Sequence, residues 1–255
     1  MFLMSKKHLV IPDTQVKPGV PTNHFTAIGN YIVAKKPDVV VHIGDHWDMH
    51  SMSSYDLDNF GFENRDYKGD IDAGNDAMKL LMAPIHKYNK GRKNKYEPRL
   101  VLTLGNHCDR ITRFRNEAKN ARFRNVVTQN DFFTEGWQVV PFKKIIKIDG
   151  VNYCHYFYAQ NSGRPIGGLA QYKLTKLKFS YVMGHQQEMS VARESLSNGQ
   201  VLRGLMAGCC YQHEEEYRGP QAKYEWRGIH LLHGVKNGDY SHCEVDLKFL
   251  LGAYL

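Results

Sequence analysis

The amino-acid sequence predicts an α/β fold whose strands end in polar residues. Four apolar segments run directly into such residues: 9–11 before Asp13, 39–43 before Asp45, 100–104 before Asn106 and 179–183 before His185. Strands that are apolar on consecutive residues are usually buried on both faces, as in the centre of a parallel sheet. The carboxyl ends of such strands form the reactive crevice of open α/β sheets. We therefore expect the four polar clusters to meet at one edge of a sheet.

The first half of the chain alternates predicted strands and helices. A strand is expected over residues 7–13 and a helix over residues 22–36, which begins at Thr or Asn and repeats apolar residues on one face. The next strand completes a βαβ unit, which is almost always right-handed. Residues 71–88 predict a second helix, which Pro84 should kink or break. A basic linker then leads to the strand at residues 100–104.

A basic helix is expected directly after that strand, over residues 109–124. Its basic residues are Arg110, Arg113, Arg115, Lys119, Arg122 and Arg124. Because the guanidinium fork matches phosphate oxygens, Arg113 and Arg115 are predicted to contact phosphate or nucleic acid. The alternative is an amphipathic helix whose arginines face only water.

The second half of the chain is rich in predicted strands. They cover residues 143–148, 151–158, 177–183, 201–205, 229–234 and 240–247, with hairpin turns at residues 197–199 and 237–239. Residues 1–255 are interpreted as a single domain, since no linker divides them. Long loops in compact domains are usually functional or mobile, so residues 49–70 and 158–173 are expected to line a cleft. For residues 49–70 a plain surface insertion is the alternative.

Composition points to a cytoplasmic protein with an anionic partner. The 34 basic and 26 acidic residues give a net charge of +8, which favours nucleic acid or nucleotides as partners. No segment approaches the roughly 20 apolar residues of a membrane span, and residues 1–7 do not form a secretion signal. We therefore expect no membrane partner and a cytoplasmic location, or the host cytoplasm for a phage protein. Oligomeric state has no signature in the sequence.

The polar clusters form a recognisable series of motifs. They are Asp13-x-Gln15, Gly44-Asp45-x-x-Asp48, Gly105-Asn106-His107-x-Asp109, His155 and Gly184-His185-x-Gln187. This series resembles the calcineurin-like metallophosphoesterase superfamily, and its compact length and Asp-Thr-Gln opening are most similar to phage-type members. The resemblance implies a four-layer sandwich, with two mixed β-sheets packed face to face and helices outside. It also implies a phosphoester hydrolase in which two divalent cations hold a hydroxide nucleophile.

The resemblance assigns a role to each motif residue. One cation would be held by Asp45, Asn106, His155 and His185, and the other by Asp13, Gln15, Asp45 and Gln187. His107 would protonate the leaving oxygen, with Asp109 as a residue to orient it. Arg110 or Arg164 would hold a phosphate oxygen. Asp48 and His46 are accessory residues, Asp48 as an additional ligand and His46 as a residue that supports the ligands.

The sequence departs from the family at two positions on the same cation. Gln15 and Gln187 stand where the family usually has histidine. An amide oxygen is a harder ligand than an imidazole nitrogen, so Mn²⁺ is expected, with Mg²⁺, Zn²⁺, Fe and Ni²⁺ as alternatives. The substitutions should also weaken binding of this cation. A one-metal enzyme and a non-catalytic scaffold therefore remain alternatives.

Two details of the motifs favour a phosphodiesterase or nuclease. The protein-phosphatase branch typically has arginine after the second aspartate and glutamate after Gly-Asn-His. Here Met49 follows Asp48, and Cys108-Asp109 follows His107. The alternative is a phosphomonoesterase that acts on a phosphoprotein or a nucleotide.

Overall fold

The computed structural model describes residues 6–53, 64–215, 219 and 225–255. Its first sheet and the adjoining helices come from both ends of the chain: β1 (Lys6–Ile11), α1 (Asn23–Lys35), β2 (Val39–His42), α2 (Tyr67–Asn89), β3 (Arg99–Thr103), α3 (Arg110–Asn116), β4 (Gln138–Val140), β10 (Gly228–Lys236), β11 (Asp239–Asp246) and α5 (Leu247–Tyr254). The second sheet comes from the middle: β5 (Ile146–Ile148), β6 (Val151–Tyr153), α4 (Ala170–Leu177), β7 (Tyr181–Met183), β8 (Met189–Ser195) and β9 (Val201–Ala207). Short 3₁₀ turns occupy His50–Met52, Ala118–Phe123 and Gln129–Asp131.

The two sheets are mixed, as predicted. The six-stranded sheet has the order β11-β10-β1-β2-β3-β4, in which β1 to β4 are parallel and β10 and β11 are antiparallel to their neighbours. The five-stranded sheet has the order β5-β6-β7-β9-β8, with β6, β7 and β9 parallel. In the parallel pairs Leu9 lies opposite Val40, and Val40 lies opposite Leu100. The carboxyl ends of β1, β2 and β3 therefore meet at one edge.

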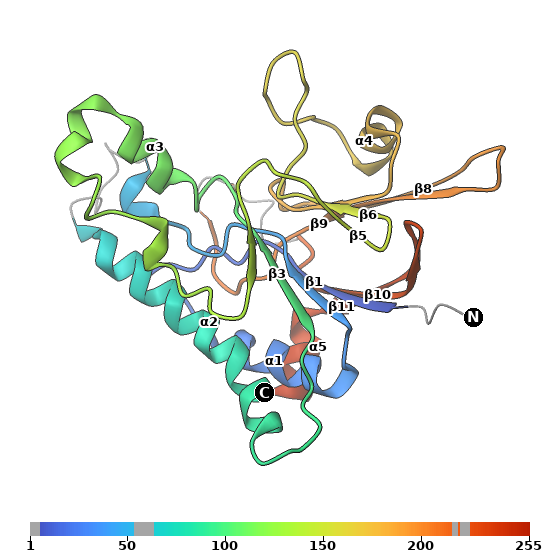
Figure 1. Cartoon of the computed structure of the whole chain (residues 1–255), viewed down its shortest axis with the longest axis horizontal. Coiled ribbons are helices and arrows are strands. Elements are labelled where there is room, and N and C mark those ends of the chain that lie inside the picture. Colours follow the sequence, from blue (N-terminus) through green and yellow to red (C-terminus); the bar gives the residue numbers. More distant parts are fainter. Residues whose placement is uncertain (1–5, 54–63, 216–218, 220–224) are drawn as a thin grey trace.

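The apolar strands are buried on both faces because they lie between two cores. Leu9 and Ile11 of β1 join the core beneath α1, α2 and α5, whereas Val10 joins the core between the two sheets. A third core lies between the second sheet and α4. Figure 1 shows the resulting layers, with α1, α2 and α5 on one side and α4 on the other. This is the four-layer sandwich that the family resemblance implies.

Helix α2 shows that Pro84 does not break the helix, which corrects one of the two predicted effects of this residue. The helix continues through Pro84 to Asn89, because its buried face is anchored in the core by residues such as Leu81 and Ile85. Pro84 packs against Gly29 of α1, where an added Cβ would lie 2.8 Å from the proline Cγ. The tight contact between the two helices holds the proline-containing turn in place.

Several predicted boundaries differ from the structure. The expected helix at residues 109–124 is only α3 followed by 3₁₀ turns, and the expected strands at 143–148, 151–158 and 177–183 shorten to three residues each. Residues 170–173 of the second predicted loop belong to α4, and residues 67–70 of the first belong to α2. Residues 54–63 of that first loop lie outside the described residues, so its role in a cleft stays a prediction. Among the helices that the structure describes, none is long and apolar enough to cross a membrane.

Candidate metal centre

The predicted ligands lie where the chain turns sharply at the strand ends. Four of them, Gln15, Asp45, His185 and Gln187, have φ values of 40°, 47°, 71° and 59°. This left-handed region is costly for residues other than glycine and is concentrated at functional sites. Gly44, at φ 106°, allows the turn before Asp45, because a Cβ there would lie 2.8 Å from His155 Nδ1. Backbone strain thus directs these side chains into one crevice.

One half of the candidate centre, which we call the imidazole half, is formed by Asp45, Asn106, His155 and His185. Ligand atoms of Asp45, His155 and His185 all lie within 4.8 Å of one another. His155 Nε2 lies 3.0 Å from both Asp45 Oδ2 and Asn106 Oδ1. Its Nδ1 lies 3.0 Å from the carbonyl oxygen of Ile43, to which it can donate. The structure therefore brings the four predicted ligands of one cation together or into direct contact.

This half fits a cation for a chemical reason. When Nδ1–H of His155 donates to the Ile43 carbonyl, the neutral ring carries a lone pair on Nε2. That lone pair faces a carboxylate oxygen and an amide oxygen, so three electron-pair donors converge. A backbone carbonyl that fixes the other ring nitrogen is the usual support of a metal-binding histidine.

The other half, which we call the amide half, is predicted to consist of Asp13, Gln15 and Gln187, with Asp45 shared between the halves. All three side chains are buried, and the backbone N–H of Gln15 donates to the carbonyl oxygen of Asp45 at 2.9 Å. The backbone N–H of His185 lies 3.1 Å from Asp13 Oδ2. The Tyr211 hydroxyl donates to Gln187 Oε1 at 2.9 Å. An amide oxygen has a second lone pair, so this oxygen can also accept a cation.

His107 lies beside Asp45 of the imidazole half, and Asp48 orients its ring. Its Nδ1 hydrogen-bonds to Asp48 Oδ1, its backbone N–H donates to Asp45 Oδ1 at 2.8 Å, and its Nε2 lies 3.9 Å from Asp45 Oδ2. The orienting role predicted for Asp109 was therefore wrong. Asp109 turns toward Thr112 in the first turn of α3, whereas Asp48 follows the β2 turn and faces the imidazole.

Electrostatics distinguish the buried groups of this centre. Burial works against charge on His107 and His155, but neighbouring carboxylates outweigh it and raise both pKa values. Burial would raise the pKa of Asp45, yet His155 and His107 hold it below its usual range. Burial raises the pKa of Asp13 to about 7, and burial lowers the pKa of His185 to about 4. Concentrated carboxylates and perturbed pKa values are typical of a functional site.

Two positively charged side chains, Arg110 and Lys17, flank Asp48, and each also contacts another group of the protein. Arg110 Nη1 donates to the carbonyl oxygen of Asp48 at 2.8 Å and lies 3.7 Å from its Oδ1. Lys17 Nζ lies 3.8 Å from Asp48 Oδ2 and binds both oxygens of Glu215 at 2.9 Å. Sequence analysis missed Lys17, Glu215 and Tyr211. Lys17 and Tyr211 fall outside the motifs, and Glu215 lies in an acidic run that is typical of exposed surface.

The remaining predicted residues lie farther from the ligands. His46 is buried behind them, where Nδ1 lies 2.9 Å from Thr14 Oγ1 and Nε2 lies 2.9 Å from the Gly74 carbonyl oxygen. Arg113 is exposed and donates to the carbonyl oxygen of Asn106 at 3.3 Å. Arg115 is half-buried in α3, and Arg164 is exposed in the turn that follows Tyr158. His46 thus supports the crevice, and phosphate contact by the three arginines stays a prediction.

Comparison with known proteins agrees with this geometry. The model of the calcineurin-like phosphoesterase family matches residues 7–199, which include every motif residue named above. No curated protein matches the chain. One crystal structure resembles it over 94% of this chain and 99% of that chain, with 9% identity and a TM-score of 0.40, which is too low to support an inference. From the family match, we conclude that the chain belongs to the calcineurin-like phosphoesterases, a family of metal-dependent phosphoester hydrolases.

Proposed function

We propose that the protein hydrolyses phosphodiesters of nucleic acid, with His107 as the general acid. The position of His107 is the observation that supports this role. Asp48 accepts from Nδ1, while Nε2 stays near Asp45 at the crevice. Because both carboxylates raise the pKa of His107, the ring can hold the proton that the leaving oxygen needs.

The ligand residues would hold two divalent cations, which supply Lewis-acid activation of the phosphoryl group and of the attacking water. Asp45, Asn106, His155 and His185 would hold one of them. Asp13, Asp45, Gln15 and Gln187 would hold the other. Since the second set offers only oxygen ligands, we propose Mn²⁺ as the metal, with Mg²⁺ as the closest substitute.

The charges around His107 favour a diester over a monoester. A terminal phosphate carries one more negative charge than a diester and would need further compensation. Lys17 is already paired with Glu215, and Arg110 already donates to the backbone of Asp48. A diester, with its single charge, matches this arrangement better.

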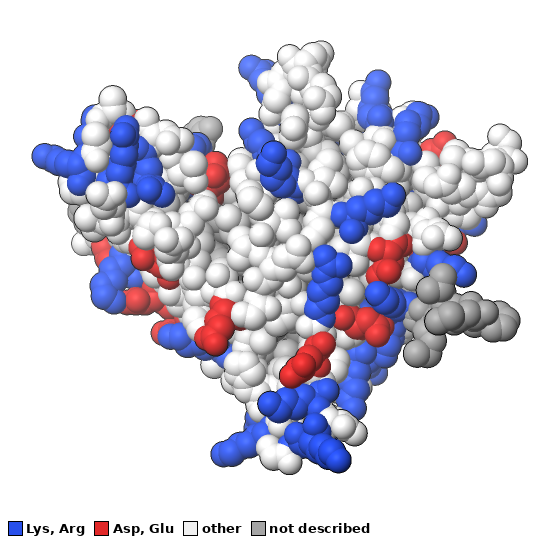
Figure 2. All heavy atoms as spheres, in the orientation of Figure 1, with Lys and Arg blue, Asp and Glu red and all other residues white. Residues whose placement is uncertain are grey.

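The distribution of basic residues favours nucleic acid as the substrate. Figure 2 shows Lys and Arg side chains gathered over the α3 region at upper left, with others on the central projection and around α4 at upper right. A mostly uncharged hollow lies between the upper-left group and the central projection. Positive flanks of this kind attract a phosphate backbone without reading its sequence.

The test is hydrolysis in the presence of Mn²⁺. Bis-p-nitrophenyl phosphate should be turned over faster than p-nitrophenyl phosphate, and His107→Ala should abolish most of the diester activity. His233→Ala, which removes an exposed histidine of β10, is the matched control and should retain it. Preference for the monoester would replace the proposal by a phosphatase. Equal activity of His107→Ala and the wild-type protein would remove His107 from the mechanism.

A further inference from the structure

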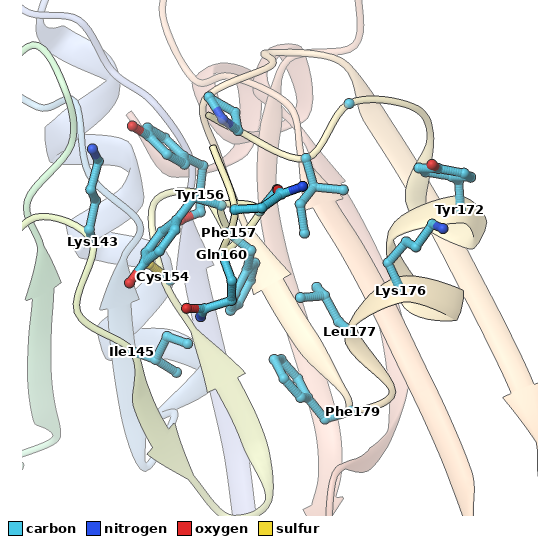
Figure 3. Close-up of a pocket in the computed structure, with 16 residues that line it drawn as sticks. Lys143, Ile145, Cys154, Tyr156, Phe157, Gln160, Tyr172, Lys176, Leu177 and Phe179 are labelled. Atoms are coloured by element: carbon cyan, nitrogen blue, oxygen red, sulfur yellow. The ribbon is translucent and has the colours of Figure 1, made fainter. Parts of the chain in front are cut away.

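A second hollow lies beside the metal centre, between the first strands of the second sheet and α4. Its volume is about 650 Å³, within the roughly 300–1,000 Å³ that small-molecule sites occupy. Figure 3 shows Lys143 and Lys176 on opposite sides of this space, with Tyr156, Gln160 and Phe179 between them. We call this space the aromatic pocket.

The aromatic pocket adjoins the metal centre through Tyr156. This residue follows the ligand His155 in the chain, lines the pocket and packs against His185 with 4.7 Å between ring centroids. Cys154, on the other side of His155, also lines the pocket. A molecule bound in the pocket would therefore lie next to the phosphate that the metal centre holds.

The pocket walls suit a flat, aromatic group attached to an anion. Tyr156, Tyr158, Tyr172 and Phe179 offer ring faces and edges for stacking. Lys143 Nζ lies 5.9 Å from the Tyr156 ring centroid and 6.0 Å from that of Tyr158, so a cation stands beside these rings. Lys176 Nζ lies 5.4 Å from the ring centroid of Tyr172 on the opposite side.

The polar groups of the pocket point to the same ligand. None of the described residues that line it is acidic, whereas two are lysines. Gln160 and Asn161 add amide groups, which can both donate and accept hydrogen bonds. A nucleotide of a nucleic-acid strand combines a flat base, hydrogen-bonding edges and a phosphate, and these pocket residues complement each of those features.

We propose that the aromatic pocket binds the nucleobase next to the scissile phosphate, so that the substrate is single-stranded at the site. This inference rests on the proposed function, because it places the base of that same substrate. Stacking on aromatic side chains is a common way to hold single strands without strict sequence preference. A base within a duplex is already stacked and paired, and it must leave the helix before a pocket can take it.

Binding can be measured without hydrolysis. Fluorescence anisotropy in EDTA would compare labelled tetrathymidylate with an abasic oligomer of the same length and charge. We expect the wild-type protein to bind tetrathymidylate roughly tenfold more tightly, the effect of about one stacked base. Equal affinity for the two oligomers, or no binding of either, would overturn the proposal.

A pair of matched variants locates the effect. Tyr172→Ala removes a side chain that is 53% exposed at the pocket, and Phe249→Ala removes one that is 53% exposed on α5. Tyr172→Ala should lose most of the tenfold preference, and Phe249→Ala should keep it. Tyr158→Ala is a second pocket variant. If both pocket variants keep the full preference while their circular dichroism matches the wild type, the base binds elsewhere and the proposal fails.

The two proposals remain separable. Preference for tetrathymidylate together with no turnover of bis-p-nitrophenyl phosphate would support the pocket and contradict the diesterase. Diester turnover together with equal oligomer affinities would leave the diesterase intact and remove the nucleobase site.

Discussion

The imidazole half and the amide half of the candidate metal centre are predicted to share Asp45, and their contacts in the structure differ. In the imidazole half the ligands contact each other, since His155 Nε2 lies 3.0 Å from Asp45 Oδ2 and from Asn106 Oδ1. In the amide half the ligands are oriented by residues around them. Tyr211 donates to Gln187, and the backbone N–H of His185 lies against Asp13.

This difference in ligands and contacts predicts different cation affinities for the two halves. Imidazole is a borderline ligand that suits Zn²⁺ and Fe, whereas carboxylate and amide oxygens suit Mn²⁺ and Mg²⁺. We therefore expect the imidazole half to bind its cation more tightly, and the amide half to exchange its cation and to depend on its surroundings.

The largest loss of activity is expected for a change of Asp45, the residue that the two halves are predicted to share. Asp45→Asn should lower diester turnover by about 10³-fold or more, because the substitution weakens both cations and the charge stabilisation that they supply. Metal content after dialysis, measured by mass spectrometry, should fall at both sites. Asp76→Asn, which changes an exposed carboxylate of α2, is the control. Loss of only one metal would show that Asp45 does not belong to both halves.

A smaller loss of activity is expected when Asp48, the partner of His107, is changed. Asp48→Asn should lower kcat about 100-fold, within the usual contribution of general acid catalysis, because His107 loses the partner of Nδ1. Asp109→Asn should change kcat much less, since Asp109 turns toward Thr112. Steady-state kinetics of both variants, with metal content measured in parallel, tests this assignment. A drop in metal content of Asp48→Asn would instead make Asp48 a ligand.

The amide half should respond to a change outside its ligands. Tyr211→Phe removes the hydroxyl that donates to Gln187 Oε1, and loss of such a supporting contact typically weakens metal affinity about 10- to 100-fold. Calorimetric titration with Mn²⁺ should show this loss for one of two sites. Tyr88→Phe, at the far end of α2, should leave both affinities unchanged. Equal weakening of both sites would contradict independent halves.

The reverse substitution tests why the halves differ. Gln15→His combined with Gln187→His should shift the metal preference of this half from Mn²⁺ toward Zn²⁺, because two oxygen ligands become nitrogen ligands. Competition between the two metals, followed by metal analysis, measures the shift. An unchanged preference would mean that the cavity rather than the ligand type selects the metal.

The sequence predicted the strand ends that carry the candidate ligands better than the residues that contact those ligands. Strand ends are predictable because consecutive apolar residues, a glycine and a polar residue recur there, as in Val41 to Asp45. Tyr211 and Gln187 are 24 positions apart, and Lys17 and Glu215 are 198 positions apart. Such contacts depend on how loops pack, which local patterns do not encode. The choice of Asp48 over Asp109 has the same origin, because both aspartates lie close to a motif glycine.

Elements that depend on tertiary packing were also missed. The edge strand β8 contains charged residues, the exposed Arg193 and the half-buried Glu194, so it shows no clear apolar alternation. Pro84 was expected to kink or break α2; the helix is not broken there, because packing against Gly29 and the core outweighs the local cost of the proline. The core strands were predicted because burial on both faces constrains their composition directly.

The smallest expected effect sets the pH range in which the two halves can be compared. Burial lowers the pKa of His230 to about 3, whereas an unfolded histidine titrates near 6.5. Below pH 6.5 the unfolded chain therefore binds a proton that the folded chain does not, and this contribution to the free energy of unfolding falls as pH falls toward 3. Between pH 7 and 5.5, His230→Gln should lose about 1 kcal/mol less stability than the wild type.

Urea unfolding in EDTA at both pH values measures that difference, because effects of the metal ligands are common to the two proteins. His233→Gln changes an exposed residue of the same strand and should follow the wild type. If His230→Gln and the wild type lose the same stability, His230 binds its proton as readily in the folded chain as in the unfolded chain. If the predicted difference is found, affinities of the imidazole and amide halves have to be compared above pH 6.5, where the fold gains or loses no proton at His230.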